Sequence, residues 1–297
     1  MTALVLLDFY TFNDYIITQY PENYEYEGKV AYIPENKEIS IQTLLELLLI
    51  YSANDAAYIS AIAVSESVDE FLILMNNKAQ TYGMSNTNFM NPDGMDEVNH
   101  YTSVNDLLKL SIKIIDSKEI ISIVSKLNFV SNVTGNEKIY NNTNLLIKEG
   151  FLGIKTGWTD KAGLTFIGLN QNSNRDILTI VNKSKVDEKK YSHFSDTKLL
   201  YKTSIETFKN YKIISKNSVI FQIRNSKGTE STRAEKDWIE FVNTNKISSV
   251  VFNDYVDSFI TVTFSKYQYI YELNKSKNNV KWKFNPLKIF NINANQN

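Results

Sequence analysis

The feature that most constrains the fold is a pair of buried helices expected in succession over residues 41–51 and 55–65. The first run is nearly continuous Leu and Ile, and the second is rich in Ala and other small residues. Ser52-Ala53-Asn54 separates them with polar side chains in an apolar setting. Because a buried polar group is costly unless it is paired or used, this junction is either a helix cap or part of a site.

A second candidate segment is Lys155-Thr156-Gly157, which occurs once in the chain. Two short apolar strands, Leu164–Leu169 and Ile177–Val181, follow it as an expected hairpin, which favours an adjacent strand for Lys155. The segment is either a turn before a strand or a binding strand. As a strand it offers a positive charge, a hydroxyl and a glycine without a Cβ to obstruct a peptide backbone.

Spacing alone does not single out Ser52, because Ser-x-Asn recurs in this chain at Ser103, Ser215 and Ser276. The order and surroundings of the two segments, taken together, favour a joint site. We therefore expect Ser52 and Lys155 to lie a hydrogen bond apart, and residues 1–8 to be helical and to border the same cleft.

Composition excludes several classes of function. The net charge of −1 does not suggest a nucleic-acid or anionic-membrane binder, and no apolar run approaches the length of a membrane span. The absence of cysteine excludes a thiol nucleophile, a disulfide framework and a Cys-ligated metal. His100 and His193 are the only histidines, and neither has a nucleophile context, so surface or hydrogen-bonded positions are expected for them.

The rest of the chain predicts helices first and strands later. Ser67 and Glu70 form a capping-box pattern for a helix that Gly83 ends. Thr102 or Ser103 caps a helix over 104–115, and a long helix is expected from Asp187 to about Lys209. Strands are expected at Val219–Ile223, Ile247–Phe252, Phe259–Phe264 and Tyr267–Tyr271, and Val280–Phe284 alternates like a strand.

These residues resemble the low-molecular-mass penicillin-binding proteins, the serine D-alanyl-D-alanine carboxypeptidases. The resemblance covers about two thirds of the chain. It is carried by Met1-Thr2-Ala3-Leu4, Ser52 to Ala57, Asn91 to Met95, Gly153 to Thr159 and Ala162-Gly163. It implies an α+β fold: a DD-peptidase/β-lactamase-like domain over 1–210, with a helical cluster packed on an antiparallel sheet, and a small all-β domain over 211–297.

The resemblance also implies roles for the site residues. Ser52 would relay a proton to the leaving amine, Asn54 would bind the substrate's amide carbonyl, and Lys155 would hold Ser52 and raise the local positive potential. The substrate-binding residues would be Thr156 for the terminal carboxylate, Gly157 beside the peptide backbone, and Trp158, whose N–H serves the oxyanion hole. Peptidoglycan stem peptides would be the substrates and β-lactams the inhibitors. No metal, cofactor or nucleic acid is implied.

One part of the family pattern is missing from its place. Met1-Thr2-Ala3-Leu4 resembles the residues that follow the family's Ser-x-x-Lys nucleophile motif. We expect either a longer gene product started upstream of Met1 or a truncated product inactive as written. An export signal, and any membrane association of an extracytoplasmic protein, would then also lie upstream. The literal Ser195-Asp196-Thr197-Lys198 stands in the wrong order and is expected to be inert.

Two alternatives to a carboxypeptidase remain open from the sequence. One is a non-catalytic peptidoglycan-binding relative. The other is a β-lactamase-like hydrolase that uses the same residues with a dedicated deacylating water.

Overall fold

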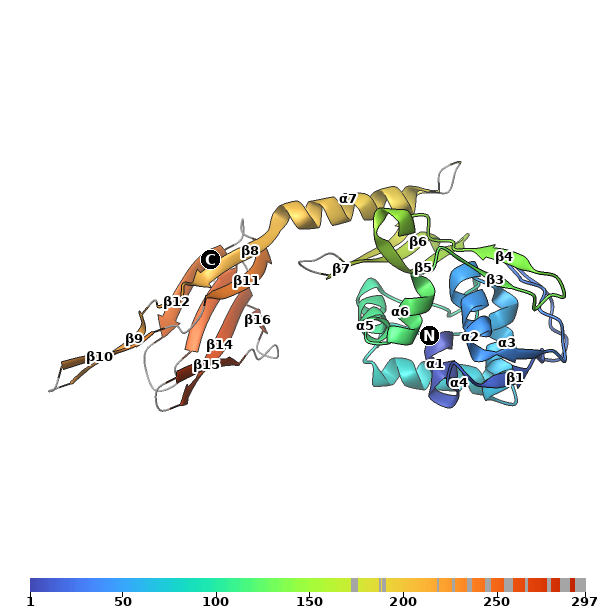
Figure 1. Cartoon of the computed structure of the whole chain (residues 1–297), viewed down its shortest axis with the longest axis horizontal. Helices are drawn as coiled ribbons and strands as arrows, with labels where there is room; N and C mark the ends of the chain where they lie inside the picture. Colours follow the sequence, from blue (N-terminus) through green and yellow to red (C-terminus); the bar gives the residue numbers. More distant parts are fainter. Residues whose placement is uncertain are drawn as a thin grey trace. The chain divides into compact units, whose positions relative to one another are not determined.

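The chain forms two compact units, residues 1–201 and 202–297 (Figure 1). The computed structural model describes residues 1–171, 176–186, 188, 191–217, 219–225, 228–233, 237–243, 247–253, 259–264, 267–276, 279–283 and 289–291. The division falls within helix α7 (Ser192–Thr207), earlier than the predicted boundary after residue 210. The helix expected to reach Lys209 ends at Thr207, because strand β8 (Phe208–Ile214) begins there and pairs with β11 (Trp238–Asn243).

The first unit begins with a helical cluster. Its elements are α1 (Thr2–Phe9), α2 (Ile41–Glu46), the π-helical turn η1 (Leu47–Tyr51), α3 (Asn54–Val64), α4 (Val68–Thr81), α5 (Val104–Ile115) and α6 (Lys118–Val124). The predicted helices over 41–51 and 55–65 are confirmed, as is the helix at residues 1–8. The sequence reading missed α6, a single short amphipathic segment of seven residues.

The apolar residues of the first long run form the centre of the core. Ile41, Leu44, Leu45, Leu47 and Ile50 are fully buried and pack with Ala56, Ala57 and Ile59 of α3 and with Leu6 of α1. Small residues on α3 let the other helices approach closely. This packing holds the junction between η1 and α3, and therefore Ser52, in one position.

Two of the predicted caps are present. The Ser67 and Ser103 hydroxyls accept hydrogen bonds from the backbone N–H groups of Glu70 and Asp106, each at 3.2 Å. The capping box at Ser67 is not reciprocal, because the Glu70 carboxylate accepts from the N–H of Glu66 instead, at 3.2 Å. Gly83 follows α4 with a φ of +68°, as expected for a residue after a helix end.

A three-stranded antiparallel sheet carries the second candidate segment. Its order is β5 (Phe151–Thr159), β6 (Gly163–Gln171) and β7 (Asp176–Ser184). Ile154 and Leu169 pack against α5 and α6, whereas Phe151 and Phe166 pack with Phe194 of α7. Helices therefore cover both faces, and the α+β fold class is confirmed.

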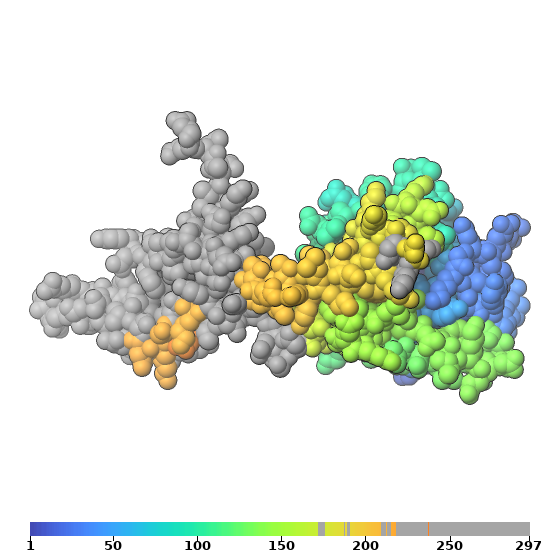
Figure 2. Space-filling model, turned by 90° about the horizontal axis from the view of Figure 1, so that it is seen from above, coloured from blue at the N-terminus to red at the C-terminus, as the bar shows by residue number. Residues whose placement is uncertain are grey.

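Two small ribbons complete the first unit, and neither was predicted. They are β1 (Tyr15–Ile17) with β2 (Glu38–Ser40), and β3 (Asn128–Ser131) with β4 (Lys138–Asn141). Figure 2 shows the blue N-terminal segments and the light-green segments around β4 on one surface, and the N–H of Thr143 donates to the carbonyl of Ile50 at 3.1 Å. Distant parts of the chain thus meet at the end of η1.

The second unit is built of strands. After β8 they are β9 (Val219–Asn225), β10 (Gly228–Arg233), β11, β12 (Ile247–Asn253), β13 (Phe259–Phe264), β14 (Tyr267–Ser276), β15 (Asn279–Lys283) and β16 (Ile289–Asn291). The predicted strands at 219–223, 247–252, 259–264 and 267–271 are confirmed, while Phe284 lies outside the described residues. Within the described part of the chain, no helix has the length and apolar character needed to cross a membrane.

Candidate active site

Ser52 and Lys155 meet although 103 positions separate them in the chain. The Lys155 ammonium donates to Ser52 Oγ at 2.6 Å and to the carbonyl of Thr156 at 2.9 Å. Ser52 lies at the end of η1, and Lys155 lies on β5, which pairs only with β6 among the described strands. The expected hydrogen-bond contact between the two segments is therefore present, and it joins the helical cluster to the sheet.

The backbone at Ser52 is unusual and is set by the helix before it. The π-helical hydrogen bonding of residues 47–51 ends when the N–H groups of Ser52 and Ala53 both donate to the carbonyl of Leu47. Ser52 then takes a left-handed conformation, with φ 66° and ψ 45°. Such a conformation costs about 1 kcal/mol or more in a non-glycine residue, and π-turns and strained residues concentrate at functional sites.

Burial and a second cation both lower the pKa of Lys155. Burial, and to a smaller extent the nearby charge of Lys29, lowers the pKa of its ammonium to about 8. Lys29 lies over the ring of Tyr51, with its ammonium 4.1 Å from the ring centroid. A lysine with a pKa near 8 can both donate and accept a proton close to neutral pH, which an ordinary lysine cannot.

Asn54 is the first residue of α3, and it donates hydrogen bonds to backbone carbonyls of the segment 27–33. Its backbone N–H donates to the carbonyl of Lys29 at 2.7 Å, and its side-chain amide donates to the carbonyl of Glu27 at 3.1 Å. Gly28 leaves room for this amide, since a Cβ there would lie 2.7 Å from Asn54 Nδ2. The next residue, Asp55, is fully buried and accepts from the N–H groups of Ala31 and Ile33, each at 3.0 Å.

The three candidate substrate-binding residues follow Lys155 along β5. The hydroxyl of Thr156 donates to Thr143 Oγ1 at 2.7 Å. Packing within the protein favours glycine at position 157, because a Cβ there would lie 2.6 Å from Thr165 Oγ1. Trp158 is about half exposed (47%) and pairs with Leu164 of β6. Lys155, Thr156 and Gly157 thus lie together at the strand, with Ser52 beside them.

The other residues weighed in the sequence make different contacts. Ser195 is exposed on α7, and Lys198 pairs with Glu149 at 3.3 Å. His193 is buried against the rings of Phe166 and Phe194, and His100 is partly buried against Phe89. Among the described residues, no group of three or more His, Asp or Glu side chains could hold a metal ion.

Lys29 and Thr143 are site residues that the sequence reading missed. Lys29 is the first basic residue of the chain, but nothing in its neighbourhood marks it as a partner of Lys155. Thr143 lies in an Asn- and Thr-rich loop without a pattern. Their positions depend on the contacts of Asn54 and of Ile50 with distant backbone, which no local motif encodes.

The fold is shared with solved DD-peptidase structures. D-alanyl-D-alanine carboxypeptidase DacD from Francisella tularensis superposes with a TM-score of 0.70 at 18% identity, over 95% of this chain and 86% of that one. Penicillin-binding protein D2 from Listeria monocytogenes, solved with bound cefotaxime, gives 0.58 at 27% identity over 68% of this chain and 82% of that one. The fold and the Ser52–Lys155 site therefore define a protein of the penicillin-binding DD-peptidase class.

The family is identified by the match of the sequence to a family model. The family model described as D-alanyl-D-alanine carboxypeptidase matches residues 1–185, and the chain belongs to this family.

Two relatives show how the similarity is distributed. DacF of Bacillus subtilis is 25% identical over 206 residues, which is 68% of this chain and 52% of the relative. A D-alanyl-D-alanine endopeptidase of Escherichia coli is 31% identical over 219 residues, 70% of this chain and 68% of the relative. The chain thus spans about half the length of the Bacillus protein.

Proposed function

We propose that the protein is a serine-type D-alanyl-D-alanine carboxypeptidase that acts on peptidoglycan stem peptides. The observation that carries this proposal is the 2.6 Å hydrogen bond between Lys155 and Ser52, formed by the two distant segments that carry the family resemblance. In this reaction the hydroxyl of a nucleophilic serine other than Ser52 attacks the peptide carbonyl, and the C–N bond breaks. D-Alanine leaves with a proton, and water then hydrolyses the ester.

Each site residue has a role in this proposal. Ser52 passes the proton to the leaving amine, and Lys155, with its lowered pKa of about 8, supplies and stabilises that proton. Asn54 binds the amide carbonyl of the substrate. Thr156 binds the terminal carboxylate, and the N–H of Trp158 helps to stabilise the oxyanion. The edge of β5 that pairs with no other described strand offers backbone groups along which an extended peptide can pair.

β-Lactams follow as inhibitors, because they acylate the serine that the peptide would acylate. This part of the proposal is supported by the Listeria protein solved with cefotaxime. Since the substrate is a wall peptide, we place the reaction outside the cytoplasmic membrane.

The test is D-alanine release from diacetyl-Lys-D-Ala-D-Ala by the full gene product. Lys155→Ala should reduce kcat/KM by roughly 10²-fold or more, the scale for loss of a preorganised charged group. Lys148→Ala, an exposed lysine near the start of β5, is the matched control and should change little. Peptide binding without D-alanine release would instead support the non-catalytic relative.

A second candidate is cleavage of cross-links by the same site. The E. coli endopeptidase named above matches as much of this chain as DacF of Bacillus subtilis does. The family resemblance therefore does not distinguish cleavage of the terminal D-Ala–D-Ala bond from cleavage of a cross-link. Incubation with cross-linked dimeric stem peptides separates them. A carboxypeptidase releases free D-alanine, whereas an endopeptidase converts dimers into monomers.

A further inference from the structure

The loop 91–96 carries part of the family resemblance but has no role in the reaction described so far. Its shape is fixed by its own side chains. The Asn91 amide donates to the carbonyl of Met95 at 3.0 Å, and its Oδ1 accepts from a backbone N–H of the same loop at 2.8 Å. The hydroxyl of the buried Thr2 donates to the carbonyl of Pro92 at 2.6 Å. The loop is therefore closed on itself and attached to the start of α1.

The last residue of this loop, Asp96, contacts the turn that follows β5. Its Oδ1 accepts from the hydroxyl of Thr159 at 2.8 Å, and its Oδ2 accepts from the N–H of Lys161 at 2.9 Å. The Thr159 oxygen accepts in turn from the N–H of Ala162 at 3.0 Å. The hydrogen bond from Lys161, together with that from Thr159, holds the pKa of Asp96 below its ordinary range, so its carboxylate is charged at neutral pH.

Strand β5 is thus attached to the helical part of the first unit at two points. Lys155 contacts Ser52 at one point, and Thr159 contacts Asp96 at the other. The pairing of β5 with β6 has no register shift across this stretch, so the side chains of Lys155 and Thr159 lie on the same face, about 13 Å apart. The residues between the two points, 156–158, are those that the proposed function assigns to the substrate.

The contact at Ser52 does not by itself fix the far end of this stretch. Thr159 is the last residue of β5, and Trp158 beside it is about half exposed. Among the described strands, β5 pairs with β6 alone. Asp96 belongs to a loop 63 positions earlier in the chain, so it holds the end of the hairpin against the helical part rather than only closing the turn.

We propose that Asp96 is a positioning residue for the reaction: it holds the end of β5 so that the N–H of Trp158 lies where the oxyanion forms. The role of Trp158 rests on the proposed function. The attachment of the strand end by Asp96 does not.

The attachment is tested first without catalysis, by NMR relaxation of the backbone amides in the full chain. In Asp96→Ala the order parameters of Trp158 and Thr159 should fall from about 0.85 to below about 0.6, the value of a flexible backbone. Thr159→Val, which lacks the hydroxyl, should give a smaller fall. Thr159→Ser keeps the hydroxyl and should resemble the unaltered protein. Unchanged order parameters in Asp96→Ala overturn the proposal.

The matched control is Asp14→Ala. The exposed Asp14 also accepts from a threonine hydroxyl and a backbone N–H, both of Thr11, at 3.0 and 2.6 Å. Its loss should leave the order parameters of Trp158 and Thr159 unchanged. If Asp14→Ala loosens the end of β5 as Asp96→Ala does, the effect is not specific to the contact with Thr159 and the proposal is wrong.

The link to the reaction is tested by D-alanine release from diacetyl-Lys-D-Ala-D-Ala by the full gene product. Asp96→Ala should lower kcat about tenfold, less than the complete loss of an oxyanion donor would. KM should stay within about twofold, because the oxyanion exists only in the transition state. Asp96→Ala/Thr159→Val should be no slower than Asp96→Ala, since both changes remove the same contact. Asp14→Ala should keep both constants.

Urea unfolding of the same variants separates positioning from turn capping. If the activity lost in Asp96→Ala equals the loss of folded protein, with kcat per folded molecule unchanged, Asp96 only caps the turn and the proposal is overturned. A rise in KM with kcat unchanged also overturns it. If the unaltered protein releases no D-alanine, the proposed function fails together with the catalytic part of this proposal, and the NMR result still decides the attachment of the strand end.

Discussion

Two residues of the site lower the stability of the folded protein, and the effect is most direct for Lys155. Its ammonium is partly buried beside another cation, Lys29, and its pKa falls to about 8. Below that pH the protein carries a charged lysine that folding disfavours. Ser52 adds a second cost through its left-handed backbone. Both costs persist because the packed helices and β5 leave these residues no other position.

Lys155→Met should stabilise the protein at neutral pH. Because the folded pKa lies below the ordinary value near 10.5, the unfolded chain binds more protons between pH 8 and 10.5. Wild-type stability therefore rises with pH across that window, and the full penalty remains below it. We expect Lys155→Met to gain about 1–2 kcal/mol at pH 7, after the loss of its bond to Ser52, and to lose this gain by about pH 10.5.

The measurement is urea unfolding of both proteins from pH 7 to 10.5. Lys148→Met, at an exposed position, should show no such pH dependence in its difference from the wild type. A Lys155→Met protein that is less stable at pH 7 would contradict the assignment of a disfavoured charge.

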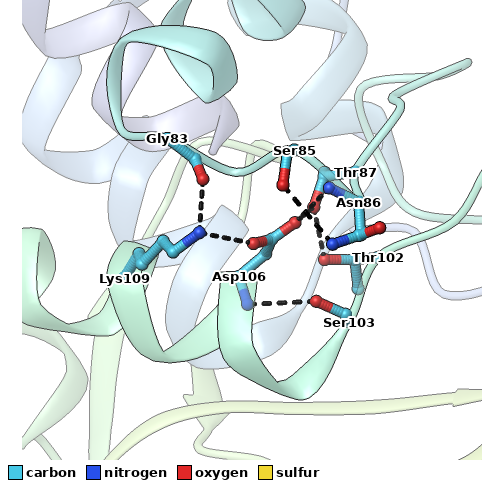
Figure 3. Close-up of polar contacts among 8 residues, drawn as sticks. All are labelled: Gly83, Ser85, Asn86, Thr87, Thr102, Ser103, Asp106 and Lys109. Atoms are coloured by element: carbon cyan, nitrogen blue, oxygen red, sulfur yellow. Dashed lines mark hydrogen bonds and ion pairs between the residues drawn. The ribbon is translucent and has the colours of Figure 1, made fainter. Parts of the chain in front are cut away.

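Asp106 is buried in a different way, because its charge is fully partnered (Figure 3). Its carboxylate accepts from the N–H of Asn86 at 2.7 Å, from Thr87 Oγ1 at 2.9 Å and from the Lys109 ammonium at 3.0 Å. Lys109 also donates to the carbonyl of Gly83. Burial raises the pKa of Asp106, but these hydrogen bonds outweigh it and hold the pKa below its ordinary range.

Asp106→Asn should lower the melting temperature by roughly 5–10 °C at pH 7, because the charged acceptor of three donors is lost. A carboxylate with a lowered pKa contributes stability above its unfolded pKa near 4 and loses it as the pH falls through the folded value. The difference between variant and wild type should therefore shrink in acid. Asp116→Asn, at the exposed end of the same helix, is the control. A difference that persists unchanged at pH 2–3 would contradict this account.

At the scale of elements, strand β5 decides whether the site assembles. Its pairing with β6 shifts register between Phe151 and Ile154, and Gly153 lies in that irregularity with φ +79°. A Cβ on Gly153 would lie 3.1 Å from the carbonyl of Val124. Since successive strand residues point to opposite faces, a one-residue slip here would turn Lys155 away from Ser52.

Gly153→Ala should therefore cost about 2–3 kcal/mol and also weaken the Ser52–Lys155 contact. Gly83→Ala is the matched control: its φ is +68°, but nothing lies within 4 Å of the added Cβ, so only the backbone strain of about 1 kcal/mol remains. Both variants are compared by urea unfolding, and the pKa of Lys155 is followed by NMR. Equal costs, with the Lys155 pKa unmoved, would show that the bulge does not position the strand.

At the scale of the whole molecule, the first unit has a core of its own. Several hydrophobic clusters lie entirely within residues 1–201. Helix α7 begins in the first unit and ends at the first strand of the second.

We expect the two units to unfold separately in urea, and the three tryptophans allow a direct test. Trp238→Phe/Trp282→Phe leaves Trp158 on β5 as the reporter of the first unit, and Trp158→Phe leaves the two reporters of the second. The two fluorescence transitions should have different midpoints. Coincident transitions in both proteins would show that the chain unfolds as one cooperative unit.

The sequence by itself determined the helices over 41–51 and 55–65, the β5–β7 hairpin region and the family. The reason is that apolar periodicity and distinctive local motifs are encoded within short windows. It also placed Ser52 and Lys155 in one site, because their surroundings resemble those of a known family.

Only the tertiary structure decided the remaining features. The π-turn that twists Ser52 and the cation Lys29 that acts on Lys155 both depend on contacts between distant segments. The short strands β1 to β4 and the end of α7 at Thr207 were also missed, because each is stabilised by its pairing partner rather than by its own residues. Local patterns therefore predict elements, whereas long-range packing sets the electrostatics on which the chemistry depends.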